Sequence, residues 1–268
     1  MSRNNARSFD GRREVLHWVR PGLLPLGTGR RGRGMVWAVL AAVLLGLGPG
    51  TATAAEALKR HFRPLYATFG DNSTTQIDVL SGPENVKMNR GGAAGKQWIV
   101  RSGEYRFKVT IEIATRVDVG TLIDRLERLP APYMRACKEV SDPKEDGIAV
   151  YADLGGAAAH GGKAYINLAP HANALVIAHE AGHCLEQVAT KNDPTIPTQW
   201  QEAIAADKIS VSDYGDNNWW EDAAEFAQVY AVCRDAGPGP LGELKKLSPR
   251  RFALWENILL YRPSEEGD

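Results

Sequence analysis

Two histidines and a glutamate stand close together in the apolar segment Ala174–His183, in the pattern His-Glu-x-x-His. In a helix, residues four apart share a face with Cβ atoms about 5–6 Å apart, so His179 and His183 can both reach one Zn²⁺ ion. Glu180 follows the first histidine and is poorly placed to bind the same ion. It is well placed to take a proton from a water molecule that the ion acidifies. The pattern predicts a hydrolytic site with one Zn²⁺ per chain and Glu180 as its base.

A third ligand must come from elsewhere, because a catalytic zinc ion usually has three protein ligands and one position open to water. Two downstream carboxylates, Glu221 and Glu225, are four residues apart and share a face of a predicted helix. One of them can ligate the ion while the other accepts a hydrogen bond from a ligand histidine. The spacing alone leaves both assignments open.

A His-Glu-x-x-His helix followed by a glutamate on a later helix resembles the gluzincin arrangement. The sequence around the glutamate is similar to the catalytic domain of anthrax lethal factor and its bacterial relatives, in which a Tyr-Gly pair precedes the ligand glutamate by seven residues with an asparagine between them. Here Tyr214, Gly215, Asn218 and Glu221 stand at those offsets. The resemblance implies that Glu221 is the third ligand. It also implies that Tyr214 donates a hydrogen bond to the oxyanion or the leaving group.

The resemblance covers about residues 160–235 and departs from the family in one respect. Ala223 stands where an aromatic residue is expected, and Phe226 is available to fill that space.

The elements that position these residues follow from the spacing of apolar residues and from capping residues. Two alternating segments around a Ser102-Gly103 turn predict a β-hairpin, and the later part of the chain alternates between short strands and helices. Strands are expected at 97–100, 105–113, 147–152 and 163–168; helices are expected at 117–129, 172–190, 198–206, 219–234 and 248–260.

This order predicts an α+β fold. The resemblance implies a zincin-like metallopeptidase domain over residues 116–268, with a small mixed sheet that has an edge strand, an active-site helix and C-terminal helices. A short β-rich segment, residues 56–115, precedes it.

In a zincin-like domain the strand before the active-site helix, Ala164–Leu168, would be an edge strand. An extended peptide would then pair with it through main-chain hydrogen bonds. We therefore expect substrate contacts from Ala164, Tyr165 and Ile166, and from His160 in the glycine- and alanine-rich turn before them. The alternative is a core strand with Tyr165 or Ile166 buried; because alternate residues face opposite sides, both can hold.

The first 55 residues predict a secretory signal peptide. Basic residues at Arg30–Arg33 precede an apolar run, Met35–Gly48, and small residues then offer cleavage after Ala54 or Ala55. The apolar run is short for a bilayer span, although an uncleaved anchor is the alternative. The expected location is the periplasm or the outside of the cell, with membrane contact only through the export signal.

The charge of the chain bears on its partners, and its cysteines bear on disulfide formation. Residues 1–55 hold 8 of the 32 Lys and Arg but 2 of the 32 Asp and Glu, so the remainder is acidic and no nucleic-acid partner is expected. In an oxidising compartment, Cys137, Cys184 and Cys233 predict one disulfide and one free thiol, with the pairing open.

Three hypotheses about function follow. The first is an exported zinc endopeptidase acting on a peptide or protein. The second is an exported, non-catalytic zinc-binding module in which the ion is structural, although such sites favour four protein ligands. The third is a cytoplasmic regulator with a His-Glu-x-x-His site, which requires translation to start after the leader.

Overall fold

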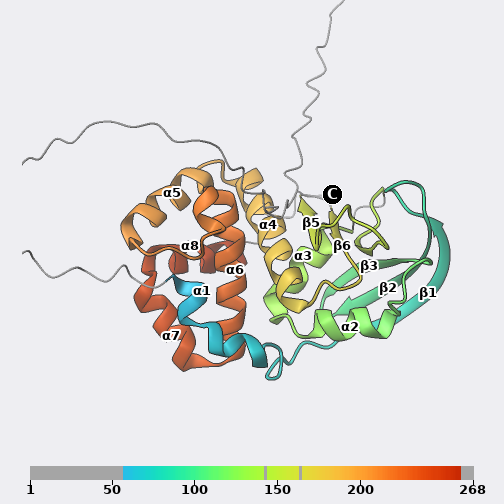
Figure 1. Cartoon of the computed structure of the whole chain (residues 1–268), viewed down its shortest axis with the longest axis horizontal. Helices are drawn as coiled ribbons and strands as arrows, with labels where there is room; N and C mark the ends of the chain where they lie inside the picture. The colour runs from blue at the N-terminus through green and yellow to red at the C-terminus, as the bar shows by residue number, and fades with distance from the viewer. Residues whose placement is uncertain (1–56, 142–143, 163–164, 261–268) are drawn as a thin grey trace, which may run out of the picture. The chain divides into compact units, whose positions relative to one another are not determined.

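The computed structural model describes residues 57–141, 144–162 and 165–260 (Figure 1). The predicted export signal lies outside these ranges, as does Ala164. All the described residues fall in a single compact unit. None of the helices in this part of the chain is long and apolar enough to span a bilayer.

An antiparallel meander of long strands begins the sheet: β1 (Asp78–Lys87), β2 (Ala94–Ser102) and β3 (Tyr105–Glu112). The pairing of β2 with β3 confirms the predicted hairpin, with Ser102 opposite Tyr105 at its turn. Phe107, Val109 and Ile111 are buried because alternate residues of a strand face the same side, here the core.

Three short strands complete the sheet: β4 (Ile148–Val150), β5 (Ala159–Gly162) and β6 (Tyr165–Leu168). The strand order is β1-β2-β3-β4-β6-β5, with β4 parallel to both β3 and β6 and with β5 antiparallel to β6. Because β3 pairs with β4, strands on both sides of the expected boundary at residue 115 belong to one sheet. The fold is α+β, with a mixed six-stranded sheet followed by helices, as the order of elements predicts.

The expectation that the strand before the active-site helix is an edge strand is wrong. That strand, β6, pairs with β4 on one side and with β5 on the other, so the free edge belongs to β5. Residues Gly155–Gly162 are too rich in glycine and alanine to show a strand pattern, and β5 forms because β6 offers it hydrogen-bonding partners. Ile166 is fully buried, Tyr165 is exposed, and His160 lies on the edge strand itself.

Eight α-helices and three 3₁₀ turns are described: α1 (Leu58–His61), η1 (Arg63–Thr68), α2 (Val119–Glu127), η2 (Ala131–Tyr133), α3 (Met134–Glu139), α4 (Ala174–Asn192), α5 (Ile196–Asp207), η3 (Gly215–Asn217), α6 (Trp219–Asp235), α7 (Pro238–Leu247) and α8 (Pro249–Leu260). The five predicted helices correspond to α2, α4, α5, α6 and α8. Helix α7 was not expected because its Pro-Gly-Pro start is typical of a loop, although proline is tolerated in the first turn of a helix.

Helix α4 lies between the sheet and helix α6. It packs on β5 and β6 of the sheet and, on another face, along α6 (Figure 1). Its core-facing residues, Ile177, Ala178, Ala181 and Leu185, are fully buried. Helix α1 and the turn η1 after it lie against α6, so the start of the described chain packs beside its C-terminal helices.

The predicted disulfide is absent. Cys137, Cys184 and Cys233 are all free and buried, because each occupies a core-facing position of its helix, α3, α4 or α6. Burial raises the pKa of the Cys184 and Cys233 thiols to about 12, so these groups behave as apolar side chains of the core.

Candidate metal centre

The two histidines are presented by the middle of α4. The helix begins after Asn173, whose side-chain oxygen accepts a hydrogen bond from the main-chain N–H of Val176 at 3.1 Å. One turn further on, the rings of His179 and His183 lie on one face with centroids 4.8 Å apart and planes at 88°. This arrangement confirms that the His-x-x-x-His pair shares a helix face.

Close packing of α6 against α4 brings Glu221 to these histidines. Gly182 lies at the contact, where an added Cβ would be 2.6 Å from Cβ of Ala227 and 3.1 Å from Cα of Ala224. Only a glycine allows the two helices to approach this far. Asn218 caps α6 by accepting a hydrogen bond from the main-chain N–H of Glu221 at 2.9 Å, which fixes this glutamate in the first turn.

Three donor atoms from two helices converge. Oε2 of Glu221 lies 3.4 Å from Nε2 of His179 and 3.4 Å from Nε2 of His183. Two ligands at about 2.0–2.2 Å from a tetrahedral zinc ion are about 3.3–3.5 Å apart, so both separations fit a shared ion. His179, His183 and Glu221 form a group that can hold a metal ion.

An unsatisfied oxygen supports this assignment. Oε2 of Glu221 is buried and has no hydrogen-bond partner among the described residues. A carboxylate oxygen that is buried without a partner costs free energy, and a cation between it and the two imidazoles would offset that cost. The residues present therefore fit Zn²⁺, with three protein ligands of the types that zinc prefers.

The electrostatics agree with a site built to hold positive charge. Burial works to lower the pKa of His179, but contacts with Glu221 and Glu225 outweigh it and raise this pKa to about 9. For Glu221, burial works to raise the pKa, but the two histidines lower it to about 2. Protons and a metal ion thus compete for the same donor atoms, and metal binding would release protons.

Glu225, the other candidate ligand, lies behind His179 rather than at the donor cluster. Its Oε1 accepts a hydrogen bond from Nδ1 of His179 at 3.0 Å. With the proton on Nδ1, the lone pair of Nε2 faces Glu221 and the position of the ion. The structure therefore separates the two glutamates: Glu221 is at the cluster, and Glu225 orients one of its histidines.

Two residues that the sequence did not single out hold Glu225. Ser212 donates its hydroxyl to Oε2 of Glu225 at 2.6 Å, and Lys59 donates its ammonium group to the same oxygen at 2.8 Å. Lys59 lies 166 positions before Glu225. No local pattern relates residues so far apart, and no signal in the sequence identifies Lys59.

Glu180 is buried against strand β5. Its Oε2 would lie 2.1 Å from a Cβ placed on Gly161, so the carboxylate occupies the space that this glycine leaves. Burial raises the pKa of Glu180 to about 7, and the charge of His179 opposes the shift. A divalent cation at the donor cluster would lower this pKa again, so that Glu180 is ionised near neutral pH, as a base requires.

Tyr214 lies beside His179. It is half-buried, and its ring centroid is 6.1 Å from that of His179. Burial and the adjacent Glu221 carboxylate raise the pKa of its hydroxyl, which therefore remains a proton donor at neutral pH. The structure thus brings Tyr214 to the same site as His179, His183, Glu180 and Glu221.

Trp220 supports the second histidine. Its ring stacks on His183 with centroids 3.9 Å apart and planes at 35°. Nδ1 of His183 has no hydrogen-bond partner in the described part of the chain, unlike Nδ1 of His179. Packing against an aromatic ring therefore orients His183 where a carboxylate orients His179. This contact between Trp220 and His183 depends on the tertiary structure.

Of the predicted substrate-contacting residues, two lie near Glu180. Tyr165 is exposed at its surface, and burial of part of its side chain, together with the charge of Glu180, raises the pKa of its hydroxyl. His160 is partly buried on β5, next to Gly161, with Nε2 3.4 Å from the Leu154 carbonyl oxygen. Ile166 points into the core and is excluded from substrate contact.

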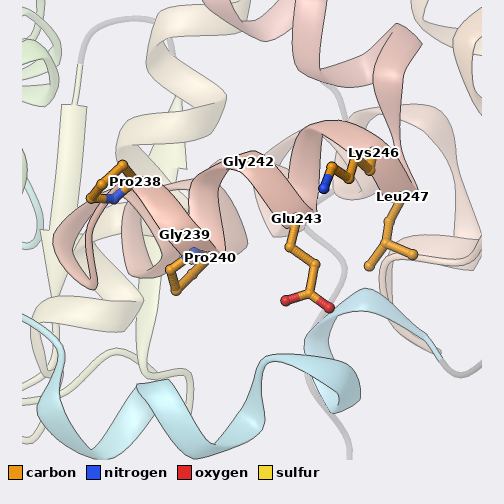
Figure 2. Close-up of a pocket in the computed structure, with 7 residues that line it drawn as sticks. All are labelled: Pro238, Gly239, Pro240, Gly242, Glu243, Lys246 and Leu247. Carbon is orange, nitrogen blue, oxygen red and sulfur yellow. The ribbon is translucent and has the colours of Figure 1, made fainter.

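A separate hollow lies on the surface of α7 (Figure 2). It is lined by Pro238, Gly239, Pro240, Gly242, Glu243, Lys246 and Leu247. None of these residues belongs to the donor cluster or contacts it, and Glu243 pairs instead with Nε2 of His61 at 2.8 Å. The hollow therefore adds nothing to the metal centre.

Comparison with known proteins identifies no relative. No family model matches the sequence, no curated protein is significantly similar to it, and no solved structure matches the fold. What is established is an α+β fold with a His179–His183–Glu221 group that can hold a metal ion.

Proposed function

We propose that this protein is an exported, zinc-dependent endopeptidase of the gluzincin type that hydrolyses peptide bonds in peptide or protein substrates. One observation carries the proposal: Nε2 of His179 and Nε2 of His183 each lie 3.4 Å from Oε2 of Glu221. That oxygen has no hydrogen-bond partner among the described residues, and the cluster lies beside the buried Glu180. The similarity of residues 160–235 to the lethal-factor group supports it. That similarity implies a ligand role for Glu221 and a hydrogen-bonding role for Tyr214, and both residues lie beside His179 in this geometry.

The proposed chemistry divides the work among the side chains. Bound Zn²⁺ supplies a Lewis acid that lowers the pKa of a coordinated water molecule. Glu180 accepts the proton of the attacking water on its carboxylate and then passes it to the leaving amine. The Tyr214 hydroxyl donates a hydrogen bond to the developing oxyanion.

The number of ligands favours catalysis over a structural role for the ion. A structural zinc site usually has four protein ligands, whereas a catalytic one leaves a position for water. Among the described residues the cluster has three members, and the nearest additional carboxylates, Glu180 and Glu225, are directed at Gly161 and at Nδ1 of His179. Export to the periplasm or the medium rests on residues 1–55 and is part of the proposal.

The test combines metal analysis of residues 56–268 with cleavage of a peptide library, using Glu180→Gln as the control. The variant should bind one zinc ion per chain as the wild type does, because Glu180 is not a ligand. Its kcat should fall by about 10²–10⁴-fold, because the general base is lost.

Three other results would contradict parts of this proposal. Full activity in Glu180→Gln would remove this residue from the mechanism. One zinc ion per chain with no cleavage of any library member would favour the non-catalytic zinc-binding module. Fractionation that finds the native protein in the cytoplasm would refute export.

A further inference from the structure

Helix α1 reaches the metal centre from the other end of the chain. Leu58 is fully buried, and Phe62, just after the helix, is 3 % exposed, so both ends of this single turn are anchored in the core. Main-chain hydrogen bonds join it to the segment before Tyr214: Leu58 N–H donates to the Ser210 carbonyl and Lys59 N–H to the Val211 carbonyl, both at 2.9 Å. The position of Lys59 is therefore fixed by its own backbone.

The side chain of Lys59 ends on Glu225. Its Nζ lies 2.8 Å from Oε2 of Glu225, whose side chain is 5 % exposed, while the lysine side chain is 35 % exposed. The Ser212 hydroxyl donates to the same oxygen, and Ser212 belongs to the segment that α1 binds. Both donors to Oε2 are thus held by one local structure, which leaves Oε1 free to accept the hydrogen bond from His179.

The balance of charges around the donor cluster also favours a cation beside Glu225. Glu180, Glu221 and Glu225 surround two imidazoles that must be neutral to bind a metal ion. One divalent ion compensates two of the three negative charges, and the ammonium group of Lys59 compensates the third. Lys59 is the one lysine or arginine in the described part of the chain that forms an ion pair with any of these carboxylates.

We propose that Lys59 is a positioning residue of the metal centre: it fixes Glu225, and through Glu225 it holds His179 in the ring orientation and tautomer that present Nε2 to the ion. Lys59 touches neither the ion nor the substrate. The proposal rests on the proposed function only in requiring that the His179–His183–Glu221 cluster binds zinc.

The test measures zinc affinity, by competition with a chelator, on protein expressed from the full sequence. Lys59→Met removes the charge but keeps a long side chain, and it should weaken zinc binding by about 10–100-fold, the usual effect of losing an outer-shell partner. Lys59→Arg keeps the charge and should recover most of the affinity. Arg60→Met is the matched control, because Arg60 is the next residue, carries the same charge and is exposed; it should change the affinity by less than about threefold.

Two further measurements separate positioning from a general effect on folding. In a Glu225→Gln background, Lys59→Met should have no additional effect on zinc affinity, because the residue through which it acts is already altered. The ¹⁵N shifts of the His179 ring in the zinc-loaded protein should show a single Nδ1-protonated form in the wild type and a mixture in Lys59→Met.

The outcomes are distinguishable. Wild-type protein that binds no zinc would defeat the proposed function itself. Wild-type protein that binds zinc, with Lys59→Met binding equally well, would overturn the role of Lys59 alone. If Lys59→Met fails to fold, equal zinc affinities for Lys59→Arg and for a folded Lys59→Gln would overturn it in the same way.

Discussion

Substituting Gly161 by alanine would test the position of the proposed base without touching it. The new methyl group would lie 2.1 Å from Oε2 of Glu180, where ordinary contact begins at 3.4 Å, so this oxygen must move by about 1.3 Å, the difference between the two. A displacement of about 1 Å from productive geometry can cost about 10²-fold in rate. We therefore expect Gly161→Ala to lower kcat for peptide cleavage about 100-fold.

The same substitution should leave the fold and the ion in place. Gly161 does not have a positive φ, and the clash is with the flexible end of a side chain rather than with backbone. Its three closest heavy atoms all belong to Glu180 and none to the ligands. Zinc content should therefore stay at one ion per chain, and the free energy of unfolding should remain within about 1 kcal/mol of the wild-type value.

The assays are steady-state cleavage of a peptide substrate, metal analysis and thermal unfolding of the same preparations. Gly239→Ala is the control, because a Cβ there meets nothing within 4 Å and the residue has no positive φ. Undiminished kcat in a folded, zinc-loaded Gly161→Ala variant would refute the reasoning, because a base displaced this far cannot work equally well. Loss of zinc would also contradict it, since the clash would then have reached the ligands.

Two more predictions concern helix α4. Gly182→Ala should lower the free energy of unfolding by about 1–3 kcal/mol in chemical denaturation and also weaken zinc binding, because the methyl group would push α6, which carries Glu221, away from α4; unchanged affinity would show that Glu221 does not depend on this contact. Glu186 is 1 % exposed, and burial raises its pKa from 4.5 to about 7, so the folded state holds a proton that the unfolded state releases. Stability from this group is therefore fully present below pH 4.5 and is lost as the pH rises to 7. The Glu186→Gln variant should not show this loss, and at pH 8 its free energy of unfolding should exceed that of the wild type by on the order of 2–3 kcal/mol. Parallel curves of unfolding free energy against pH for the two proteins would refute the assignment.

A metal ion at the candidate centre would also account for polar groups that are buried in this core. Glu180, His183 and Glu225 are each 8 % exposed or less, and burial of such groups is unfavourable unless they are paired. His179 and Glu225 form a hydrogen bond with each other, while Oε2 of Glu221 and Nδ1 of His183 have no hydrogen-bond partner in the described part of the chain. Several buried ionisable groups gathered at one place are typical of a functional site.

Local sequence determined the two helices that carry the candidate site and the donor residues on them. The apolar spacing around His179 and His183 specifies a helix, and residues four apart in a helix must share a face whatever surrounds them. Asn173 and Asn218 stand at the starts of α4 and α6 because their side chains satisfy main-chain N–H groups of the first turn. These effects act over a few residues, and both helices were predicted from the sequence, although the helix expected from residue 172 begins at Ala174, after its cap.

Tertiary packing decided how the elements meet. Glu221 and Glu225 are equivalent in spacing, and only the rotation of α6 against α4, set by the contact at Gly182, assigns one to the donor cluster and the other to Nδ1 of His179. Pairing with β6 turned a glycine-rich segment into the edge strand, and the fold brought Lys59 across 166 positions to Glu225. Such contacts depend on the shape and register of whole elements, and residue types along a chain do not encode them locally.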